Sequence, residues 1–331
     1  MKLLDTTLRD GGNVVGHGFD ETLTVSIVKG LIASGVRDIE LGNSKGIGAY
    51  GRLGATKAPS DQAYYVLLKP YTGKARLGMF VQAKLAAADE IREAADAGLH
   101  FLRVGANAGD GKTAVDAVRM VKDAGLYCRY ALMKGYILSP EELAAEAKML
   151  ADAGVDCVTI MDSAGTMLPR ETARYVRTLK EALSIPVGFH GHSNLGLSQA
   201  NALAAVEVGA DEIDCGLLGM ARSAGNCATE LAAATLKKEG YLPDVDLYSL
   251  LDYLDRELIP AMAPYGYHVA VNPTDLVLGL SGCHSNFLPV FRKVAEEEGV
   301  SLLKLIAEVS AVDQKAPDEE LIRRTAAKLA H

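Results

Sequence analysis

Two histidines placed two positions apart are the residues of this sequence with the clearest capacity for chemistry. His190 and His192 stand at the end of the apolar run that contains Gly188 and Phe189. Side chains at positions i and i+2 of an extended strand project from the same face, so both imidazoles can reach one point, as in a metal site. Two hydrogen-bonded polar histidines at a strand end produce the same pattern, and the pair alone favours neither interpretation.

The N-terminal segment carries a second group of polar residues in a similar position. Leu3 and Leu4 open an apolar first strand, Arg9 and Asp10 follow it, and Gly11-Gly12 breaks the strand into a loop. An arginine and an aspartate beside an apolar strand are unfavourable unless they are paired or used. Together with the histidines, they favour the interpretation as a metal site.

Composition limits the architecture that could bring these segments together. With 331 residues, 49% hydrophobic and 23% charged, the chain can bury a large core and forms one large domain or one domain with an appendage. The net charge of −8 and the lack of a lysine and arginine cluster provide no attraction to phosphate backbones. We expect no nucleic-acid partner.

The sequence shows neither a signal peptide nor a membrane span, and we base an expectation about cellular location on this. The first strand begins at once, which leaves no room for a signal peptide, and no stretch approaches the roughly 18 apolar residues of a membrane span. We therefore expect a cytoplasmic protein with no membrane contact. The cysteines are scattered without a Cys-x-x-Cys pair, and we expect them to be reduced and mostly buried: Cys128, Cys157, Cys215, Cys227 and Cys283.

A recurring pattern predicts the fold: a helical segment ends at a small residue and a glycine, and an apolar strand follows. The pattern predicts helix C-caps at five glycines: Gly35, Gly98, Gly125, Gly154 and Gly209. Their spacing is about 30 residues or about twice that, which indicates a repeated βα unit. Strands starting near Lys2, Arg76 and Ile185 fill the remaining places and complete a set of eight.

Eight βα units over about 240 residues are typical of a (βα)8 TIM barrel. The absence of a Gly-x-Gly-x-x-Gly loop after the first strand argues against a dinucleotide-binding sheet. We predict an α/β fold with a TIM-barrel catalytic domain over residues 1–240 and a helical C-terminal domain over residues 241–331. Apolar residues at helical spacing in that domain predict core or subunit-interface contacts: Leu247, Leu250, Leu251 and Leu254.

The barrel provides a rule for sorting the candidate site residues, because functional residues of TIM barrels gather at the C-terminal ends of the strands. Polar residues at or after five predicted strands meet this condition and are expected to face one mouth: Asp10, Glu40, Asp162, His190 with His192, and Asn226.

Three motifs together resemble the DRE-TIM metallolyase superfamily: Thr7-Leu8-Arg9-Asp10-Gly11, His190-Gly191-His192 and Ala224-Gly225-Asn226. Members include 3-hydroxy-3-methylglutaryl-CoA lyase, the isopropylmalate and homocitrate synthases, and 4-hydroxy-2-oxovalerate aldolase. The likeness covers nearly the whole chain. The segments 188–197, 279–282 and 287–288 most resemble the aldolases.

The resemblance implies a divalent metal ion held by Asp10, His190 and His192, with Asn226 near or on it. Manganese is the first choice, with magnesium, cobalt or zinc as alternatives. A carboxylate, two imidazoles and an amide oxygen suit a hard or borderline ion with open positions, which a 2-oxo acid substrate could fill.

The resemblance also assigns Arg9 to the developing negative charge on the substrate's keto oxygen. The alternative is a structural partner of a strand-end carboxylate such as Glu40 or Asp162. Glu40 is a further catalytic candidate. We rank Glu40 and Asp162 below Arg9, because a structural role, or a role in supporting residues that contact the substrate or metal, fits both carboxylates better. Ser163 ranks lower still.

The acid-base positions depart from the aldolase pattern. The family has a histidine three residues after the metal aspartate, where this chain has Asn13, and a tyrosine in the tail motif, where this chain has His284. Two residues could replace the base: His284, if the tail covers the barrel mouth, and His17, in the loop after the first strand. We favour His284, because a lone histidine such as His17 is more often an ordinary polar residue.

We therefore predict a metal-dependent aldolase that cleaves a 4-hydroxy-2-oxo acid to pyruvate and an aldehyde through a metal-stabilised enolate. One alternative is an acyl-CoA lyase or Claisen-type synthase, although Met220 stands where the lyase carries a cysteine. Another is a non-catalytic barrel. The resemblance implies an acylating aldehyde dehydrogenase partner, and the C-terminal helices could equally form a homodimer. The chain length of the aldehyde stays open.

Overall fold

The computed structural model describes the whole chain except residues 53–57, 243, 268–272 and 331. Its eight strands are parallel and close into a barrel in chain order, with β8 hydrogen-bonded to β1. They are β1 (Lys2–Asp5), β2 (Asp38–Leu41), β3 (Arg76–Gln82), β4 (Phe101–Asn107), β5 (Tyr127–Met133), β6 (Cys157–Asp162), β7 (Val187–Gly191) and β8 (Glu212–Cys215). The predicted TIM barrel is confirmed.

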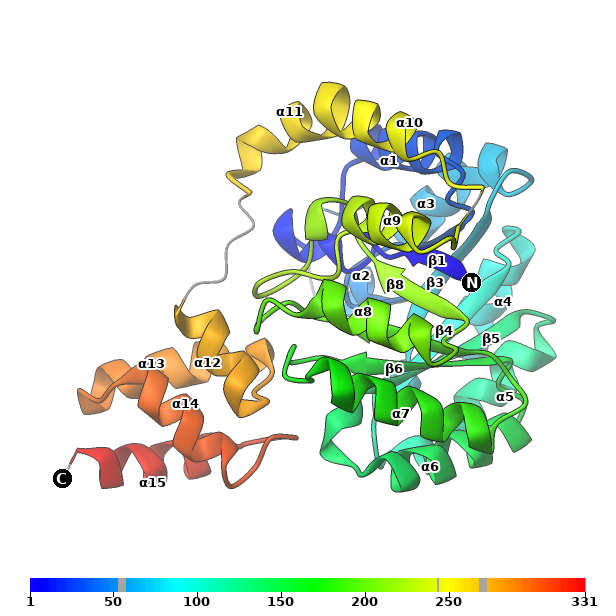
Figure 1. Cartoon of the computed structure of the whole chain (residues 1–331). Coiled ribbons are helices and arrows are strands. Elements are labelled where there is room, and N and C mark those ends of the chain that lie inside the picture. The colour runs from blue at the N-terminus through cyan, green and yellow to red at the C-terminus, as the bar shows by residue number, and fades with distance from the viewer. Residues whose placement is uncertain (53–57, 243, 268–272, 331) are drawn as a thin grey trace.

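Helices surround the barrel in Figure 1 and follow the strands in sequence. They are α1 (Glu21–Ala33), α2 (Ala49–Arg52), α3 (Asp61–Leu68), α4 (Ala88–Asp96), α5 (Val115–Asp123), α6 (Pro140–Asp152), α7 (Pro169–Ala182), α8 (Ser198–Glu207) and α9 (Thr229–Lys238). Gly35 and Gly154 have φ angles of 87° and 112° directly after helices, as the predicted C-caps require. Ser139 begins α6 with a capping box to Glu142.

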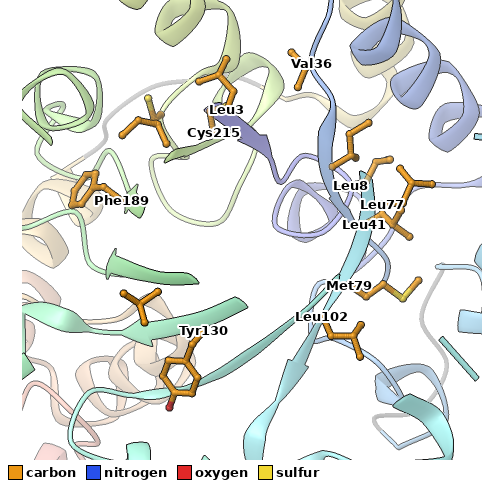
Figure 2. Packing of buried hydrophobic residues seen from close by; sticks show 14 of the residues in the cluster. Leu3, Leu8, Val36, Leu41, Leu77, Met79, Leu102, Tyr130, Phe189 and Cys215 are labelled. Atoms are coloured by element: carbon orange, nitrogen blue, oxygen red, sulfur yellow. The ribbon is translucent and has the colours of Figure 1, made fainter. Parts of the chain in front are cut away.

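The apolar core lies mainly between the strands and this ring of helices. Every residue of β6 is buried, as expected for a barrel strand that is covered on both faces. Figure 2 shows part of this cluster, including Leu41, Leu77 and Leu102. All five cysteines are buried and unpaired, as predicted.

The inside of the barrel differs from the aliphatic filling that is usual for this fold. Arg103 from β4 lies fully buried between Glu40 of β2, at 2.7 Å, and Asp214 of β8. Arg129 from β5 pairs in the same way with Asp38, at 2.9 Å, and with Glu212. These ion pairs link strands across the barrel, so the barrel interior below the site is a buried charge network.

The C-terminal helices divide between two hydrophobic clusters. The first group is α10 (Leu247–Tyr253), the π-helix η7 (Leu254–Leu258) and α11 (Ile259–Met262), which pack with α1 and α9 on the barrel core. Leu250 and Leu254 are buried there, whereas Leu251 is 40% exposed. The packing of these helices favours a boundary later than residue 240, and the predicted division stays a prediction.

The second cluster is formed by α12 (Pro273–Ser281), α13 (Leu288–Glu298), α14 (Leu302–Ser310) and α15 (Glu319–Leu329). Figure 1 shows this bundle beside the barrel. Its loops reach the C-terminal ends of the strands: the Tyr136 hydroxyl donates to the Gly282 carbonyl oxygen at 3.1 Å, and Lys134 Nζ donates to the Lys315 carbonyl oxygen. Among the described residues, we find no helix with the length and apolar character needed to cross a membrane.

Candidate active site

The predicted metal ligands meet at the C-terminal ends of β1, β7 and β8. Asp10 follows β1, and Nε2 of His190 and Nε2 of His192 lie 3.7 Å and 3.8 Å from its Oδ2. One ligand atom from each of the three residues lies within 4.8 Å of the others, and all three side chains are buried. The structure thus contains a possible metal-binding site at the place that the strand-end rule predicts.

The orientation of His190 is set by a carboxylate on the neighbouring strand. Its Nδ1 donates to Oδ2 of Asp214 at 3.1 Å, which leaves the lone pair of Nε2 directed towards Asp10. Burial opposes the charge on Asp214, but Arg103 and His190 outweigh burial and hold the pKa of this carboxyl below its usual value. A histidine fixed by a carboxylate at its other ring nitrogen is a common arrangement around metal ions.

His192 and Asn226 supply donor atoms that the protein itself leaves unused. Burial, assisted by nearby cations, lowers the pKa of His192 to about 3, so its ring is neutral at pH 7. Asn226 donates through Nδ2 to Oδ2 of Asp10 at 2.9 Å, while its Oδ1 is buried and has no hydrogen-bond partner among the described residues. A carboxylate, two imidazoles and a free amide oxygen fit a divalent cation.

Arg9 lines the same pocket with one unused donor. Its Nε donates to Oε1 of Glu40 at 2.6 Å, its Nη1 lies 3.0 Å from Oδ1 of Asp10, and its guanidinium lies 5.4 Å from the centre of the Phe80 ring. Although burial opposes the positive charge, Asp10 and Glu40 raise the pKa of Arg9. The buried Nη2 has no hydrogen-bond partner in the described structure. It is a charged donor available to a ligand.

Glu40 and Asp162 lie behind the pocket rather than in it. Glu40 is fully buried and bridges Arg9 to Arg103, so its contacts are those of a residue that positions Arg9. Asp162 accepts hydrogen bonds from the backbone N–H groups of Thr166 and Met167, and burial raises its pKa to about 6 in spite of them. The Ser163 hydroxyl lines the pocket and accepts from the backbone N–H of Lys134 at 3.0 Å.

His284 enters the pocket from the C-terminal tail. It is only 7% exposed, its Nε2 lies 3.3 Å from Nη1 of Arg222, and its Nδ1 accepts from the backbone N–H of Asn286 at 3.1 Å. Burial and the charge of Arg222 hold the pKa of His284 well below its usual value. The ring is therefore neutral and lies at the mouth of the barrel.

The other two acid-base positions lie outside this pocket lining. Asn13 donates through Nδ2 to the Asp10 carbonyl oxygen at 2.8 Å and so supports the local turn. His17 has a left-handed φ of 77°, and its Nδ1 lies 2.8 Å from the Ser44 hydroxyl. Between the two candidate bases, the structure brings only His284 to the pocket.

Four cationic residues of the pocket lining were missed by sequence reasoning: Lys45, Lys84, Lys134 and Arg222. Arg222 has Nη2 at 3.6 Å from Oδ1 of Asp10 and donates through Nη1 to Oδ1 of Asn286 at 3.0 Å. Lys45 follows β2 and Lys134 follows β5, and both line the pocket. Their positions after strands were a usable signal, but none of them belongs to a motif that drew attention.

The pocket has a volume of about 510 Å3, within the range of small-molecule sites. Its lining combines the possible metal ligands, Arg9 and His284 with polar side chains from the other side of the mouth. It can therefore hold a small acidic molecule at a metal ion, beside a charged donor and a neutral histidine.

Comparison with known proteins places the chain in a family. Residues 1–256 match the HMGL-like family model. The chain is 33% identical to a 4-hydroxy-2-oxovalerate aldolase of Chloroflexus aggregans over 97% of this chain and 93% of the relative. It is 35% identical to a 4-hydroxy-2-oxovalerate aldolase of Nocardia farcinica over 100% of this chain and 94% of the relative.

Solved structures share the fold at lower sequence identity. The N-terminal domain of a proposed aldolase from Bacteroides vulgatus aligns with a TM-score of 0.71 at 22% identity, covering 85% of this chain and 92% of that one. The carboxyl transferase domain of Rhizobium etli pyruvate carboxylase aligns with a TM-score of 0.80 at 16% identity, covering 100% of this chain and 60% of that one. By its family model and its aldolase relatives, the chain belongs to the HMGL-like family of DRE-TIM metallolyases and is a carbon–carbon lyase.

Proposed function

We propose that this protein is a divalent-metal-dependent aldolase that cleaves a 4-hydroxy-2-oxo acid to pyruvate and an aldehyde. The observation that carries the proposal is the meeting of Asp10, His190 and His192 with the unpaired Nη2 of Arg9 in one buried pocket. The relatives that are 4-hydroxy-2-oxovalerate aldolases support the same reaction class.

In this proposal Asp10, His190 and His192 hold the cation, and Asn226 contributes its free amide oxygen. The bound ion supplies Lewis-acid polarisation of the 2-oxo group. Manganese remains our first choice, with magnesium, cobalt or zinc as alternatives. Asp214 keeps His190 in the tautomer that binds metal, because it accepts the proton of Nδ1.

Arg9 acts on the charge that develops during cleavage. When the C3–C4 bond breaks, its electron pair moves into the enolate of pyruvate, and negative charge grows on the former keto oxygen. The free Nη2 of Arg9 donates to that oxygen, while Glu40 holds the guanidinium through its Nε. A preorganised charged donor in a buried site stabilises such a transition state strongly. We therefore assign Glu40 to positioning of Arg9.

His284 is the proposed base that takes the proton of the C4 hydroxyl. For Nε2 to accept this proton, the neutral ring must carry its own proton on Nδ1, so the hydrogen bond from the Asn286 N–H must be given up. The positive charge of Arg222, whose Nη1 lies 3.3 Å from Nε2 of His284, disfavours the protonated ring. It therefore promotes transfer of the proton from His284 onward, either to C3 of the enolate or to water. His17 does not line the pocket and is the weaker candidate.

The decisive test measures pyruvate release from 4-hydroxy-2-oxo acids through lactate dehydrogenase, with manganese and with chelator. We expect release that chelator stops and added manganese restores. His284→Asn should lower kcat by about 10² to 10⁴. The control His100→Asn should leave kcat unchanged, because His100 directly precedes β4 at the other, N-terminal end of the barrel. Release that persists in chelator, or no release from any substrate, would overturn the proposal.

The alternatives gain no specific support. Met220, which occupies the place of the acyl-CoA lyase cysteine, is fully buried, and the described lining of the pocket contains no thiol. For the partner, we propose contact through the helices α12–α15, either with an acylating aldehyde dehydrogenase or with a second copy of the chain. A cytoplasmic location stays a prediction.

A further inference from the structure

We infer that the aldehyde half of the substrate carries an anionic group, a carboxylate or a phosphate, which binds to Lys45 and Lys134 on the rim of the barrel above β2–β5. This inference rests on the proposed aldol cleavage and specifies its substrate class. The lining of the pocket is asymmetric in a way that the cleavage chemistry leaves unexplained.

The chemistry occupies only one side of the barrel mouth. The possible metal ligands belong to β1, β7 and the loop after β8, which are adjacent in the closed barrel. The strands β2 to β5 continue the rim from β1 around the rest of the mouth. Residues of that rim line the same pocket: Lys45, Gln82, Lys84, Asn107, Asp110 and Lys134. A substrate whose 2-oxo acid end sits at the metal ligands must extend its other end towards this rim.

The pocket carries more positive than negative side chains. Its cations are Arg9, Lys45, Lys84, Lys134 and Arg222, and its only carboxylates in the described lining are Asp10 and Asp110. Asp10 is already shared by Arg9 and Arg222, and Asp110 pairs with Lys315 from outside the lining at 2.8 Å. The charges of Lys45 and Lys134 are therefore not balanced by these two carboxylates.

Lys45 is held at the pocket by its backbone rather than by its charge. Its carbonyl oxygen accepts from Nε2 of Gln82 at 2.9 Å, and its N–H donates to Oδ1 of Asn43 at 3.0 Å. The side chain is half-buried, and we find no carboxylate within ion-pair distance of it in the described part of the chain. A fixed main chain with an uncommitted ammonium group suits the binding of an anion.

Lys134 is placed at the pocket by an unusual backbone conformation. Its φ and ψ of 57° and 41° are left-handed, a backbone conformation that residues other than glycine rarely adopt. The residue is only 8% exposed. An ammonium group has three donors, and one is used on the Lys315 carbonyl oxygen. Nζ also lies 5.3 Å from the centre of the Phe287 ring. Donors thus remain for a ligand.

The size of the pocket agrees with a substrate longer than the simplest one. A five-carbon 4-hydroxy-2-oxo acid has nine non-hydrogen atoms, and even at the roughly 30 Å3 of a separate water molecule for each atom it would fill no more than about 270 Å3. The pocket has about 510 Å3, so about half of it remains for the other end of the substrate. The competing expectation is an alkyl aldehyde packed on Phe80, Met133 and Met161, which also line it.

The test compares matched substrates with the full-length, metal-loaded protein. The neutral substrate is 4-hydroxy-2-oxopentanoate, which yields acetaldehyde. The anionic substrates are 4-hydroxy-2-oxoglutarate, which yields glyoxylate, and 4-hydroxy-2-oxo-5-phosphopentanoate, which yields glycolaldehyde phosphate. In each case the C3–C4 bond breaks, the C4 hydroxyl proton is transferred to the enzyme, and pyruvate forms by protonation of the enolate. We expect kcat/KM to be at least tenfold higher for an anionic substrate, and the better of the two identifies the group.

The variant Lys45→Gln isolates the subsite. It should raise KM for the preferred anionic substrate by roughly ten- to a hundredfold and change the kinetics of the neutral substrate by at least tenfold less. Lys148→Gln on the outer helix α6, where the side chain is 63% exposed, removes the same charge far from the pocket and should change neither. Lys134→Gln is a second variant, read with a thermal melt because this residue also holds the tail.

The outcomes separate this inference from the proposed function. Equal or better cleavage of the neutral substrate, or an equal effect of Lys45→Gln on both classes, overturns the anionic subsite and leaves the aldolase intact. Absence of pyruvate from every substrate overturns both. An anionic preference that Lys45→Gln abolishes establishes the subsite.

Discussion

The substitution Asp214→Asn tests whether the charge network inside the barrel supports the metal site. Asp214 accepts from Nδ1 of His190 at 3.1 Å and pairs with Arg103, and all three side chains are buried. The variant loses the carboxylate that fixes the tautomer of His190. It also leaves Arg103 with Glu40 as its remaining partner in this network.

Two magnitudes follow from these contacts. Loss of a carboxylate that orients a metal-binding histidine weakens metal affinity by about 10- to 100-fold. Breaking one partnership of a buried arginine lowers the free energy of unfolding by about 3–5 kcal/mol, and the remaining ion pair with Glu40 favours the lower end. The variant should therefore fold less stably and bind manganese more weakly.

The matched control is Glu212→Gln. Glu212 lies two residues away on the same strand, is buried, and pairs with Arg129 rather than with a residue at the metal site. Manganese affinity is measured by titration and stability by urea unfolding of the metal-free protein. We expect both variants to lose stability and only Asp214→Asn to lose affinity. Equal manganese affinity in the two variants would refute the role of Asp214.

Three further perturbations test other parts of the account. Arg9→Lys keeps the charge but loses the planar fork, so kcat should fall by about 10²- to 10³-fold while manganese content stays unchanged; a rise in KM alone would contradict this. Burial raises the pKa of Asp5 from 3.8 to about 6, so between these pH values the folded state binds a proton that the unfolded state has released. The contribution of Asp5 to stability is therefore fully present below pH 3.8 and is lost as the pH rises through 6. In urea titrations, the stability of the wild type relative to Asp5→Asn should therefore fall by about 2 kcal/mol between pH 4 and pH 7, and a pH-independent difference would refute the shift. Tyr136→Phe removes the 3.1 Å hydrogen bond to Gly282 and should weaken tail docking by about 1 kcal/mol; hydrogen exchange should rise in residues 282–287 and stay unchanged in β6.

The parts of this protein that could be predicted from sequence depend on local rules. Gly35 and Gly154 mark helix ends because their φ angles require glycine, and the repeat of such ends implies a parallel barrel. In a barrel, strand ends converge whatever the details of packing. The meeting of Asp10, His190 and His192 therefore needed only the fold and the motif positions.

The remaining features depend on contacts between distant segments. The partnership of Arg103 with Asp214 exists only after the barrel closes, and the sequence shows each as a single charged residue in an apolar strand. His284 reaches the mouth because α12–α15 pack beside it, which the helical pattern of the tail does not specify. Lys45 and Lys134 follow strands, but only the shared pocket relates them to each other.

The most direct test of the central claim is exchange of the pyruvate methyl protons in deuterium oxide, followed by proton NMR without any aldehyde. The proposed enolate forms and reprotonates at C3 whatever the aldehyde is, so this measurement does not depend on the unknown substrate. We predict exchange with manganese, none with chelator, and at least a 10²-fold loss in Arg9→Lys. Absence of manganese-dependent exchange in a protein that binds manganese at Asp10, His190 and His192 would contradict the account.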